Sequence, residues 1–403
     1  MSVYIISTTS SQSYKIIHYF SNIKSYNLRR SMHVEREIAG VALPFIIGIA
    51  ISVYTGIIRC NAFSTAIASL TLCLLLIILL LSDRALIRNR TACWSILICM
   101  MALCGIHIGS SDIILSISNL HNSHPIGDLA LGFGGRLQEA IMRIPFSKPE
   151  TCNIINALIT GDKSGIPTDI KEAFRSSGAS HILALSGLHL GIIYAIIRKP
   201  LALIGNTPLA KVLKSVMTIC ICCFYTLATG AGPSIVRALL FIIISETALL
   251  THRKSSLIST LMTAMVIQLV IDPSSIQEIG FQLSYAAVAG IALIYPRLSS
   301  FWPGNGFDDN IMTKGMRWIW NSAALSISCQ LTTGPLAYFY FGSFPLHFIL
   351  TNLIALPLTG LIIPSALITL LTSELGCCPE ILIRATEMLV SALSAALNVI
   401  STM

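Results

Sequence analysis

Long apolar runs alternate with short polar connections along most of the chain. The runs approach the roughly 20 residues that a helix needs to cross a bilayer. They are rich in Leu and Ile and show no alternation of polar and apolar positions. Because lipid offers no hydrogen-bond partners, spanning segments are helices or strands of closed barrels, and the missing period-two pattern predicts helices. We therefore predict an all-α, polytopic transmembrane bundle.

About ten or eleven spans are predicted. Two of them fall within His347–Leu371 and Ile381–Met403, and Pro357 and Pro364 predict that the first of these is either two short helices or one broken helix. The remaining predicted spans are Val41–Ile58, Phe63–Ser82, Cys93–Ser110, Ile182–Ile197, Val212–Thr229, Pro233–Leu250, Leu257–Ile271, Leu283–Tyr295 and Trp318–Phe341.

The spacing of the spans divides the chain into four parts: a cytoplasmic segment (1–40), three transmembrane helices (41–110), an extracytoplasmic segment (111–180) and the main transmembrane domain (181–403). In the third part, Leu131–Ile144 spaces apolar residues by three and four, with charged residues between them. This pattern predicts a short amphipathic helix. The pattern fits equally a helix lying along the membrane surface and one packing on the bundle.

Composition supports a lipid environment. Of the 403 residues, 54% are hydrophobic and 11% are charged, against about 25% charged in soluble domains. The net charge of +8 could mark a nucleic-acid surface, but in membrane proteins excess Lys and Arg usually mark cytoplasmic loops. With the basic N-terminus placed in the cytoplasm, the other basic loops fall inside and the loop with Asp272 and Glu278 falls outside. The first long apolar run, from Val41, is expected to be a retained span.

Metal and cofactor chemistry is not predicted. The twelve cysteines are scattered through apolar stretches without the Cys/His spacing of a zinc site. No ATP-binding P-loop occurs in the sequence, so a motor would have to be another protein.

The densest polar cluster lies at the start of a predicted span, in the stretch Ser180–Gly191. On a continuous helix, Ser186 and His189 would share one face, and Gly187 and Gly191 would let a neighbouring helix approach closely. The polar pair could line a pore or bond to a neighbouring helix. A serine nucleophile with a histidine base is a third reading, but no G-x-S-x-G elbow and no orienting acid accompany it. We predict no enzyme.

Two later span starts also carry polar residues. A glycine-rich turn precedes Pro233, which suits a first helical position, and Arg237 follows one turn later. Arg237 could reach toward lipid headgroups or attract phosphate at an entrance, and Glu246 lies on the opposite helix face. Gln282 and Ser284 enter the next span after the Asp-Pro turn.

The segment from Gly334 to Pro357, which includes Pro335, Pro345 and Asn352, is predicted to break its helices repeatedly near the bilayer. Broken helices at membrane depth are tolerated where they line a cavity. This segment therefore predicts a pathway.

These clusters, in this order, resemble the ComEC family of bacterial competence proteins. The central block is Gly161–Pro167 followed by Phe174, Gly178 and His181–Gly191. The turn before Arg237, the Asp272–Ser284 loop and the Asn352–Pro357 segment are similar to later family blocks, so that the resemblance covers roughly Gly127–Pro357. It implies a channel through which one DNA strand crosses the bacterial inner membrane. The channel-lining or gating residues that it implies are Ser186, His189, Arg237, Gln282, Ser284 and Asn352.

The sequence also departs from the family pattern. It has no room for the extracytoplasmic OB-type domain after Ser110 and no H-x-H-x-D-H cluster of the metallo-β-lactamase-like domain. We therefore expect a reduced family member whose partners are single-stranded DNA, the lipid bilayer and other uptake proteins, among them a separate nuclease and a motor ATPase. Whether the chain forms a homo-oligomer is left open by the sequence. The alternative functions are a small-solute transporter and a family member without DNA uptake.

Overall fold

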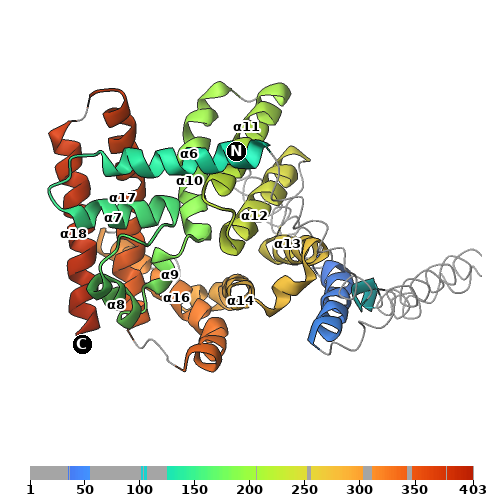
Figure 1. Cartoon of the computed structure of the whole chain (residues 1–403). Helices are drawn as coiled ribbons and strands as arrows, with labels where there is room; N and C mark the ends of the chain where they lie inside the picture. Colours follow the sequence, from blue (N-terminus) through green and yellow to red (C-terminus); the bar gives the residue numbers. More distant parts are fainter. Residues whose placement is uncertain are drawn as a thin grey trace, which may run out of the picture. The chain divides into compact units, whose positions relative to one another are not determined.

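The computed structural model describes residues 35, 37–54, 101–102, 104–106, 125–205, 207–251, 256–302, 311–342, 347–377 and 379–402. The predicted span Phe63–Ser82 and most of Cys93–Ser110 lie outside these residues, as does the N-terminal segment up to residue 34. Within the described ranges all regular secondary structure is helical (Figure 1). The predicted all-α class is confirmed.

The chain forms two compact units, one of residues 1–111 with 253–270 and one of residues 112–252 with 271–403. In the first unit, the helix Glu37–Tyr54 packs on the helical stretch that includes Ala102 and Gly105. Gly48 lies against the Ala102 carbonyl, and Gly105 lies against the Phe45 carbonyl. Small residues at both crossing points let the two backbones meet, as in many membrane bundles. This unit also contains nearly all of α13 (Leu257–Ile271).

The second unit holds the remaining described helices. They are α6 (Pro125–Met142), α7 (Pro149–Thr160), α8 (Thr168–Ser176), α9 (Ser180–Leu183), α10 (Gly187–Leu201), α11 (Pro208–Ala228), α12 (Pro233–Leu250), α14 (Ile279–Leu293), α15 (Tyr295–Ser300), α16 (Ile311–Phe341), α17 (Phe348–Glu374) and α18 (Glu380–Ser401), with 3-10 turns η1 (Ala202–Ile204) and η2 (Pro273–Gln277).

Seven helical segments among the described residues are long and apolar enough to cross a membrane: Glu37–Tyr54, Gly187–Ile204, Pro208–Ala228, Pro233–Leu250, Ile279–Ser300, Phe348–Glu374 and Glu380–Ser401. A shorter apolar helix is α13, and α16 is longer, at 31 residues, but richer in polar residues. The prediction of a polytopic membrane bundle is confirmed.

The predicted amphipathic helix is α6, which packs on α7 and α11, and α7 in turn packs on α17 and α18 (Figure 1). The buried face of α6 includes Ala130, Gly134 and Ile141, and Gly134 lies against the Ala228 carbonyl at the end of α11. α7 is buried along most of its length and shares one core with α17 and α18. The helix α6 therefore packs on the bundle, and the boundary predicted at residue 180 falls inside one compact unit.

The outer surface of α6 is itself amphipathic. Arg136 and Glu139 are exposed opposite the buried face. Leu131 and Phe133 are 55% and 47% exposed along the two flanks, and Leu129, which shares the outer face with Arg136, is 66% exposed. Exposed apolar flanks beside a charged outer face are typical of helices at a membrane interface. The two roles left open by the sequence, packing on the bundle and lying at the interface, are thus compatible in one helix.

The helix breaks predicted at Pro335, Pro357 and Pro364 are wrong, and Pro345 lies outside the described residues. Pro335 lies inside the continuous α16, and Pro357 and Pro364 lie inside the continuous 27-residue α17. A proline removes one backbone hydrogen bond, but α17 packs along α18 and is bonded to it through Thr369 and Thr386, whose hydroxyls are 3.1 Å apart. In a membrane bundle such neighbours keep a proline-containing helix continuous. Pro357 is therefore not a helix-breaking residue.

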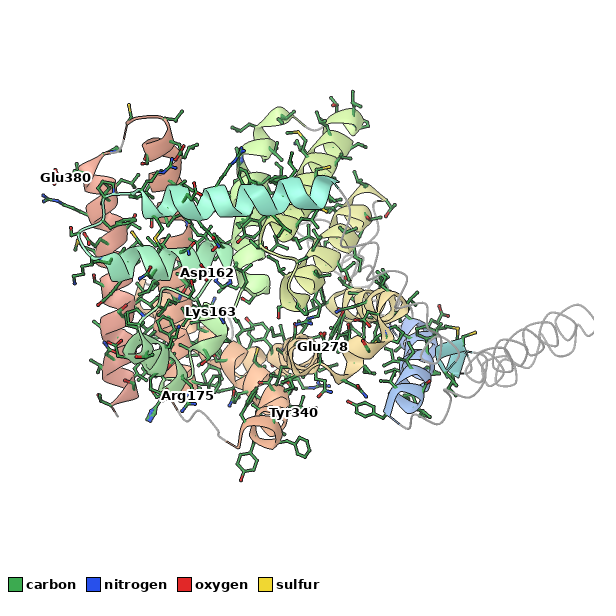
Figure 2. All side chains as sticks on the ribbon, in the orientation of Figure 1. Asp162, Lys163, Arg175, Glu278, Tyr340 and Glu380 are labelled. Carbon is green, nitrogen blue, oxygen red and sulfur yellow. The ribbon has the colours of Figure 1, made fainter. Side chains whose placement is uncertain are left out.

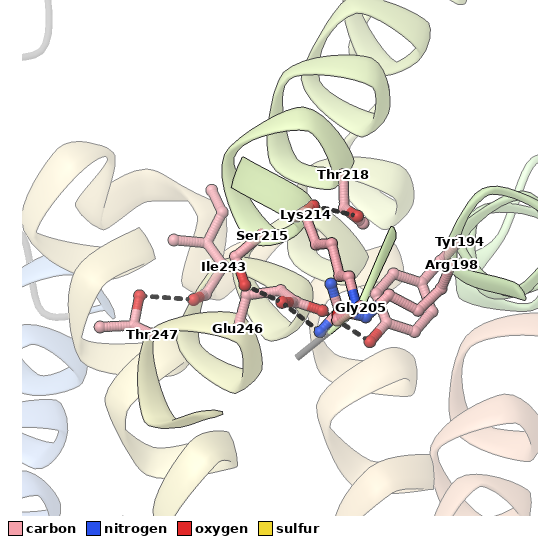
Figure 3. Close-up of polar contacts among 9 residues, drawn as sticks. All are labelled: Tyr194, Arg198, Gly205, Lys214, Ser215, Thr218, Ile243, Glu246 and Thr247. Carbon is pink, nitrogen blue, oxygen red and sulfur yellow. Dashed lines mark hydrogen bonds and ion pairs between the residues drawn. The ribbon is translucent and has the colours of Figure 1, made fainter. Parts of the chain in front are cut away.

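A buried carboxylate joins α10, α11 and α12 (Figure 3). The side chain of Glu246 on α12 is fully buried. It accepts hydrogen bonds from the Tyr194 hydroxyl, at 2.7 Å, and the Ser215 hydroxyl, at 2.6 Å, and forms an ion pair with Arg198 at 3.3 Å. Nearby, the Lys214 ammonium donates to the Gly205 carbonyl. A charge buried in this way is retained only when it is paired and hydrogen-bonded. The network therefore fixes the three helices to one another.

Replacing Glu246 should destabilise the bundle. The Glu246→Ala variant leaves Arg198 without its counter-charge and should lower the unfolding free energy by about 3–5 kcal/mol, whereas Glu246→Gln keeps hydrogen-bonding capacity and should cost less. Thermal unfolding of the protein in detergent measures both. The control is Glu380→Gln, which removes an exposed i,i+4 pair with Arg384 worth at most about 0.5 kcal/mol. Equal effects at the two sites would contradict the anchoring role.

Candidate functional site

A break in the chain separates α9 from α10 at the predicted span Ile182–Ile197. Ala184 and Ser186 have extended backbones, and Ser186 is the residue before the first turn of α10. The expectation that Ser186 and His189 lie on one face of a continuous helix is wrong. They meet nonetheless, because the His189 Nδ1 atom accepts a hydrogen bond from the Ser186 backbone N–H at 3.2 Å and lies 3.1 Å from its hydroxyl. The imidazole thus caps the helix start.

The capping contact determines which imidazole nitrogen carries the proton. An atom that accepts a backbone N–H bond is unprotonated, so neutral His189 carries its hydrogen on Nε2. The side chain is 1% exposed, and Nε2 has no hydrogen-bond partner among the described residues. No carboxylate in the described part of the chain accepts from Nε2, as the base of a serine hydrolase would require. His189 therefore presents an unused donor to the bundle interior.

The turn after α7 supports the break. Gly161 has φ +84°, which favours glycine, and a Cβ at this position would lie 2.7 Å from the Leu185 Cδ1 atom. The next residue, Asp162, accepts from the Ser164 backbone N–H at 2.9 Å, and hydrogen bonds from Ser164 hold the pKa of this carboxyl below its usual range. Asn156 also donates to Asp162, at 3.4 Å. The start of the block Gly161–Pro167 is therefore a turn that packs against the break.

Arg237 lies in the second turn of α12 and is 2% exposed. One nitrogen, Nη2, donates to the Ser234 hydroxyl at 2.8 Å and to the Gly280 carbonyl at 2.7 Å. The Nε and Nη1 atoms are buried without a partner among the described residues. The guanidinium carbon lies 6.0 Å from the Tyr285 ring centroid, a cation–π distance. This burial excludes the headgroup-reaching role considered from the sequence.

The first turns of three helices meet around these groups. Gly187 at the start of α10 lies against Ala238 on α12, where a Cβ would be 3.5 Å from the Ala238 Cβ. Arg237 in turn contacts Gly280 in the first turn of α14. Helix N-termini carry partial positive charge from unpaired backbone N–H groups. The site therefore combines three positive helix ends with a buried guanidinium, and the exposed Glu278 beside Gly280 interacts with that guanidinium.

The other predicted site residues lie around this centre. Gln282 on α14 donates to the Ile276 carbonyl at 3.0 Å and accepts from the Tyr340 hydroxyl at 2.8 Å. Asn352 on α17 donates to the Ser326 hydroxyl at 3.4 Å, and its side chain also lies beside His181.

Ser284 and Gly191 make fewer described contacts than the other predicted site residues. Ser284 is half-buried on α14, and no described contact joins its side chain to the other site residues. A Cβ at Gly191 would meet no atom within 4 Å, so the close approach seen at Gly187 does not extend one turn along α10. Pro233 occupies the first position of α12, as predicted from the sequence.

The unsatisfied atoms single out the site. Within the described residues, buried side-chain atoms without a hydrogen-bond partner occur in six residues: Ser52, His189, Arg198, Arg237, Gln330 and Asn352. Three of the six belong to the residues singled out from the sequence. A buried polar group without a partner costs free energy, and such groups are few in a folded protein. No group of acidic, histidine and cysteine residues suited to a metal occurs in the described part of the chain.

Comparison with known proteins places the chain in a family. The family model described as "Competence protein" matches residues 158–403, which include α9, α10, α12, α14 and α17 and all the site residues above. The chain belongs to the competence protein family. The resemblance to ComEC proteins is thereby confirmed for this region.

Two curated relatives each match more than half of the chain. ComE operon protein 3 of Bacillus subtilis is 25% identical over 229 residues, which are 57% of this chain and 27% of the relative. An uncharacterized Escherichia coli protein, YcaI, is 24% identical over 213 residues, 52% of this chain and 27% of the relative. The match thus spans about a quarter of each relative's length. No solved structure matches the chain.

Sequence reasoning missed the partners of Glu246 and the contact of Tyr340 with Gln282. An acidic residue inside an apolar span was the available signal for Glu246, because such residues are expensive in lipid and require a partner. Tyr194 and Ser215 carry no comparable signal, since they lie on other helices and are common in membrane spans.

Alanine at Gly161 should disturb the break through two effects. The Gly161→Ala variant suffers the cost of positive φ, about 1–2 kcal/mol, and a clash with Leu185 that should add about 1–3 kcal/mol. The matched control is Gly376→Ala, where φ is +74° but no atom lies within 4 Å of the new Cβ. A second control, Gly132→Ala in an exposed helix position, should stabilise by about 0.5–1 kcal/mol. Thermal unfolding compares all three, and equal losses at residues 161 and 376 would disprove the contact's role.

Proposed function

We propose that this chain forms a conduit for single-stranded DNA through a bacterial inner membrane during natural transformation. Membership of the competence protein family supports a role in DNA uptake, and the membrane-spanning helices supply the setting. The observation that carries the finer proposal is the buried Arg237, whose Nε and Nη1 atoms have no partner among the described residues.

The chemistry of the site selects an acceptor-rich anion. A guanidinium binds phosphate oxygens through paired N–H groups, and it does so most strongly away from water. The Nε2 donor of His189 and the positive ends of α10, α12 and α14 act in the same direction. A phosphodiester backbone carries one such anion per nucleotide and bears no carboxylates. The arrangement therefore fits a strand that moves past the site phosphate by phosphate.

The proposal also includes the membrane orientation, the partner proteins and the roles of Ser186 and His189. The N-terminus lies in the cytoplasm, segment 111–180 contributes to the outer side, and the family's nuclease and a motor ATPase act as partners. Ser186 and His189 stabilise the break and contact the strand without catalysing a reaction. A small-anion transporter would use the same donors, so the tests below separate the two functions by ligand.

Removing the Arg237 guanidinium should reduce DNA uptake. Charge-assisted hydrogen bonds are worth about 1.5–3 kcal/mol, so Arg237→Gln should lower transformation frequency by about 10- to 100-fold, with Arg237→Lys intermediate. The variants replace the resident copy in a competent strain, and immunoblots and unfolding midpoints confirm that they are folded. The control is Arg384→Gln, at an exposed arginine. Unchanged transformation with Arg237→Gln would overturn the proposal.

Binding by the purified full chain in nanodiscs identifies the ligand. An oligodeoxythymidylate should bind with an affinity that falls steeply as salt rises, and Arg237→Gln should reduce both the affinity and the salt slope. Inorganic phosphate serves as the competitor. Displacement of the oligonucleotide by equimolar phosphate would instead indicate a transporter of small anions.

A further inference from the structure

Four consecutive aromatic residues end α16 and face outward from the bundle. Phe339 is 81% exposed, Tyr338 is 63% exposed, Phe341 is 60% exposed and Tyr340 is 36% exposed. At 100° per residue, four successive side chains cover most of the circumference of the helix. They cannot all pack into the core, and Figure 2 shows Tyr340 at the free end of this helix. The helix end therefore presents a cluster of rings, which we call the aromatic end (Tyr338–Phe341).

The aromatic end is connected to the Arg237 site. The Tyr340 hydroxyl donates to Gln282 at 2.8 Å, and Gln282 is two residues beyond Gly280, whose carbonyl accepts from Arg237 at 2.7 Å. α14 and α16 pack closely along their lengths. A fixed hydrogen bond thus holds the exposed rings beside the first turn of α14, where the buried guanidinium lies.

Aromatic rings also continue inward from this end. Phe281 and Tyr285 on α14 are buried, with ring centroids 4.4 Å apart, and the Tyr285 ring lies 6.0 Å from the Arg237 guanidinium carbon. On the outer side, the Phe339 and Tyr340 rings meet edge to face at 5.4 Å. Aromatic rings therefore lie on both the exposed and the buried side of Gln282, next to the Arg237 N–H groups that we propose bind phosphate.

Rings beside phosphate donors are the combination that binds single-stranded nucleic acid. Such proteins hold the backbone with cations and stack successive unpaired bases on aromatic side chains, and the stacking tolerates any sequence. We propose that the aromatic end binds the unpaired bases of the DNA strand at the mouth of the Arg237 site. The inference rests on the proposed function, and it adds a base-binding surface to a site so far defined by phosphate.

Aromatic residues at helix ends also anchor membrane proteins at the headgroup level. Substitution of an aromatic residue by leucine distinguishes membrane anchoring from base stacking. Leucine retains apolar contact with lipid but has no π-face, so it should preserve anchoring and abolish stacking. Phe339 is the best position, because it is the most exposed of the four and its described ring contact is the one to Tyr340.

The experiment compares two probes on the full chain in nanodiscs: an oligodeoxythymidylate and an abasic oligonucleotide of equal length. The wild-type chain should bind the oligodeoxythymidylate about ten-fold or more tightly, because stacking accounts for about that factor per base. The double variant Phe339→Leu with Tyr338→Leu removes the two most exposed rings of the aromatic end, so it should lose most of the preference for bases and keep the salt dependence. The matched control is Phe301→Leu, an exposed phenylalanine (74%) just after α15, which should retain the preference for bases.

The outcomes separate this inference from the proposed function. Binding that depends on Arg237 but is equal for the two probes in the wild type would overturn the base-binding surface and leave the conduit intact. A preference for bases that is undiminished in the double variant would show that these exposed rings do not stack on bases and would also overturn it. Absence of binding to either probe would overturn the conduit itself.

Discussion

Every polar group inside this bundle must find its partner within the protein, because lipid supplies none. Most hydroxyls in the spans meet this requirement by bonding back to their own helix, as Thr218 does to Lys214 and Thr359 does to Ala355, both at 2.7 Å. Glu246 meets it with partners from two other helices. Against that background, His189 and Arg237 are exceptions that share with Arg198 and Gln330 a buried donor without a described partner.

The alternation of helix directions explains why these donors gather. α10 and α12 are joined through a single intervening helix, α11, and their N-terminal turns pack together at Gly187 and Ala238. The break before Gly187 and the glycine turn before Pro233 start both helices abruptly. α14 begins beside them, after the 3-10 turn η2. A site of positive helix ends thus follows from the chain's connectivity, and the side chains add specificity to it.

Much of the fold could be predicted from the sequence, because hydropathy reports directly on the solvent that each helix meets. The apolar runs around Pro233–Leu250 and Leu257–Ile271 coincide with α12 and α13. Local signals failed where tertiary packing decided the outcome. Pro357 predicts a helix break from the sequence, but it lies within the continuous helix α17.

The site residues show the same limit. Arg237 near a helix end resembles a residue that reaches for headgroups, and only the approach of α14 shows that it is buried. Ser186 and His189 meet through a helix cap in place of the expected continuous helix, and hydropathy does not detect such a cap.

The two charged residues of α12 have different surroundings, because Glu246 is fully paired whereas Arg237 keeps donors without a described partner. Arg237 and Glu246 are nine residues apart, or about 13.5 Å along the axis, and point to opposite faces. Arg198 neutralises the Glu246 carboxylate, and two hydroxyls donate hydrogen bonds to it, so this end of α12 is fixed to α10 and α11. The arginine has two hydrogen-bond partners on one nitrogen and none described on the others. Burying a cation in this condition is unfavourable, and an anion arriving at Arg237 would relieve that cost. The anchored end of α12 therefore holds Arg237 in position beside α14.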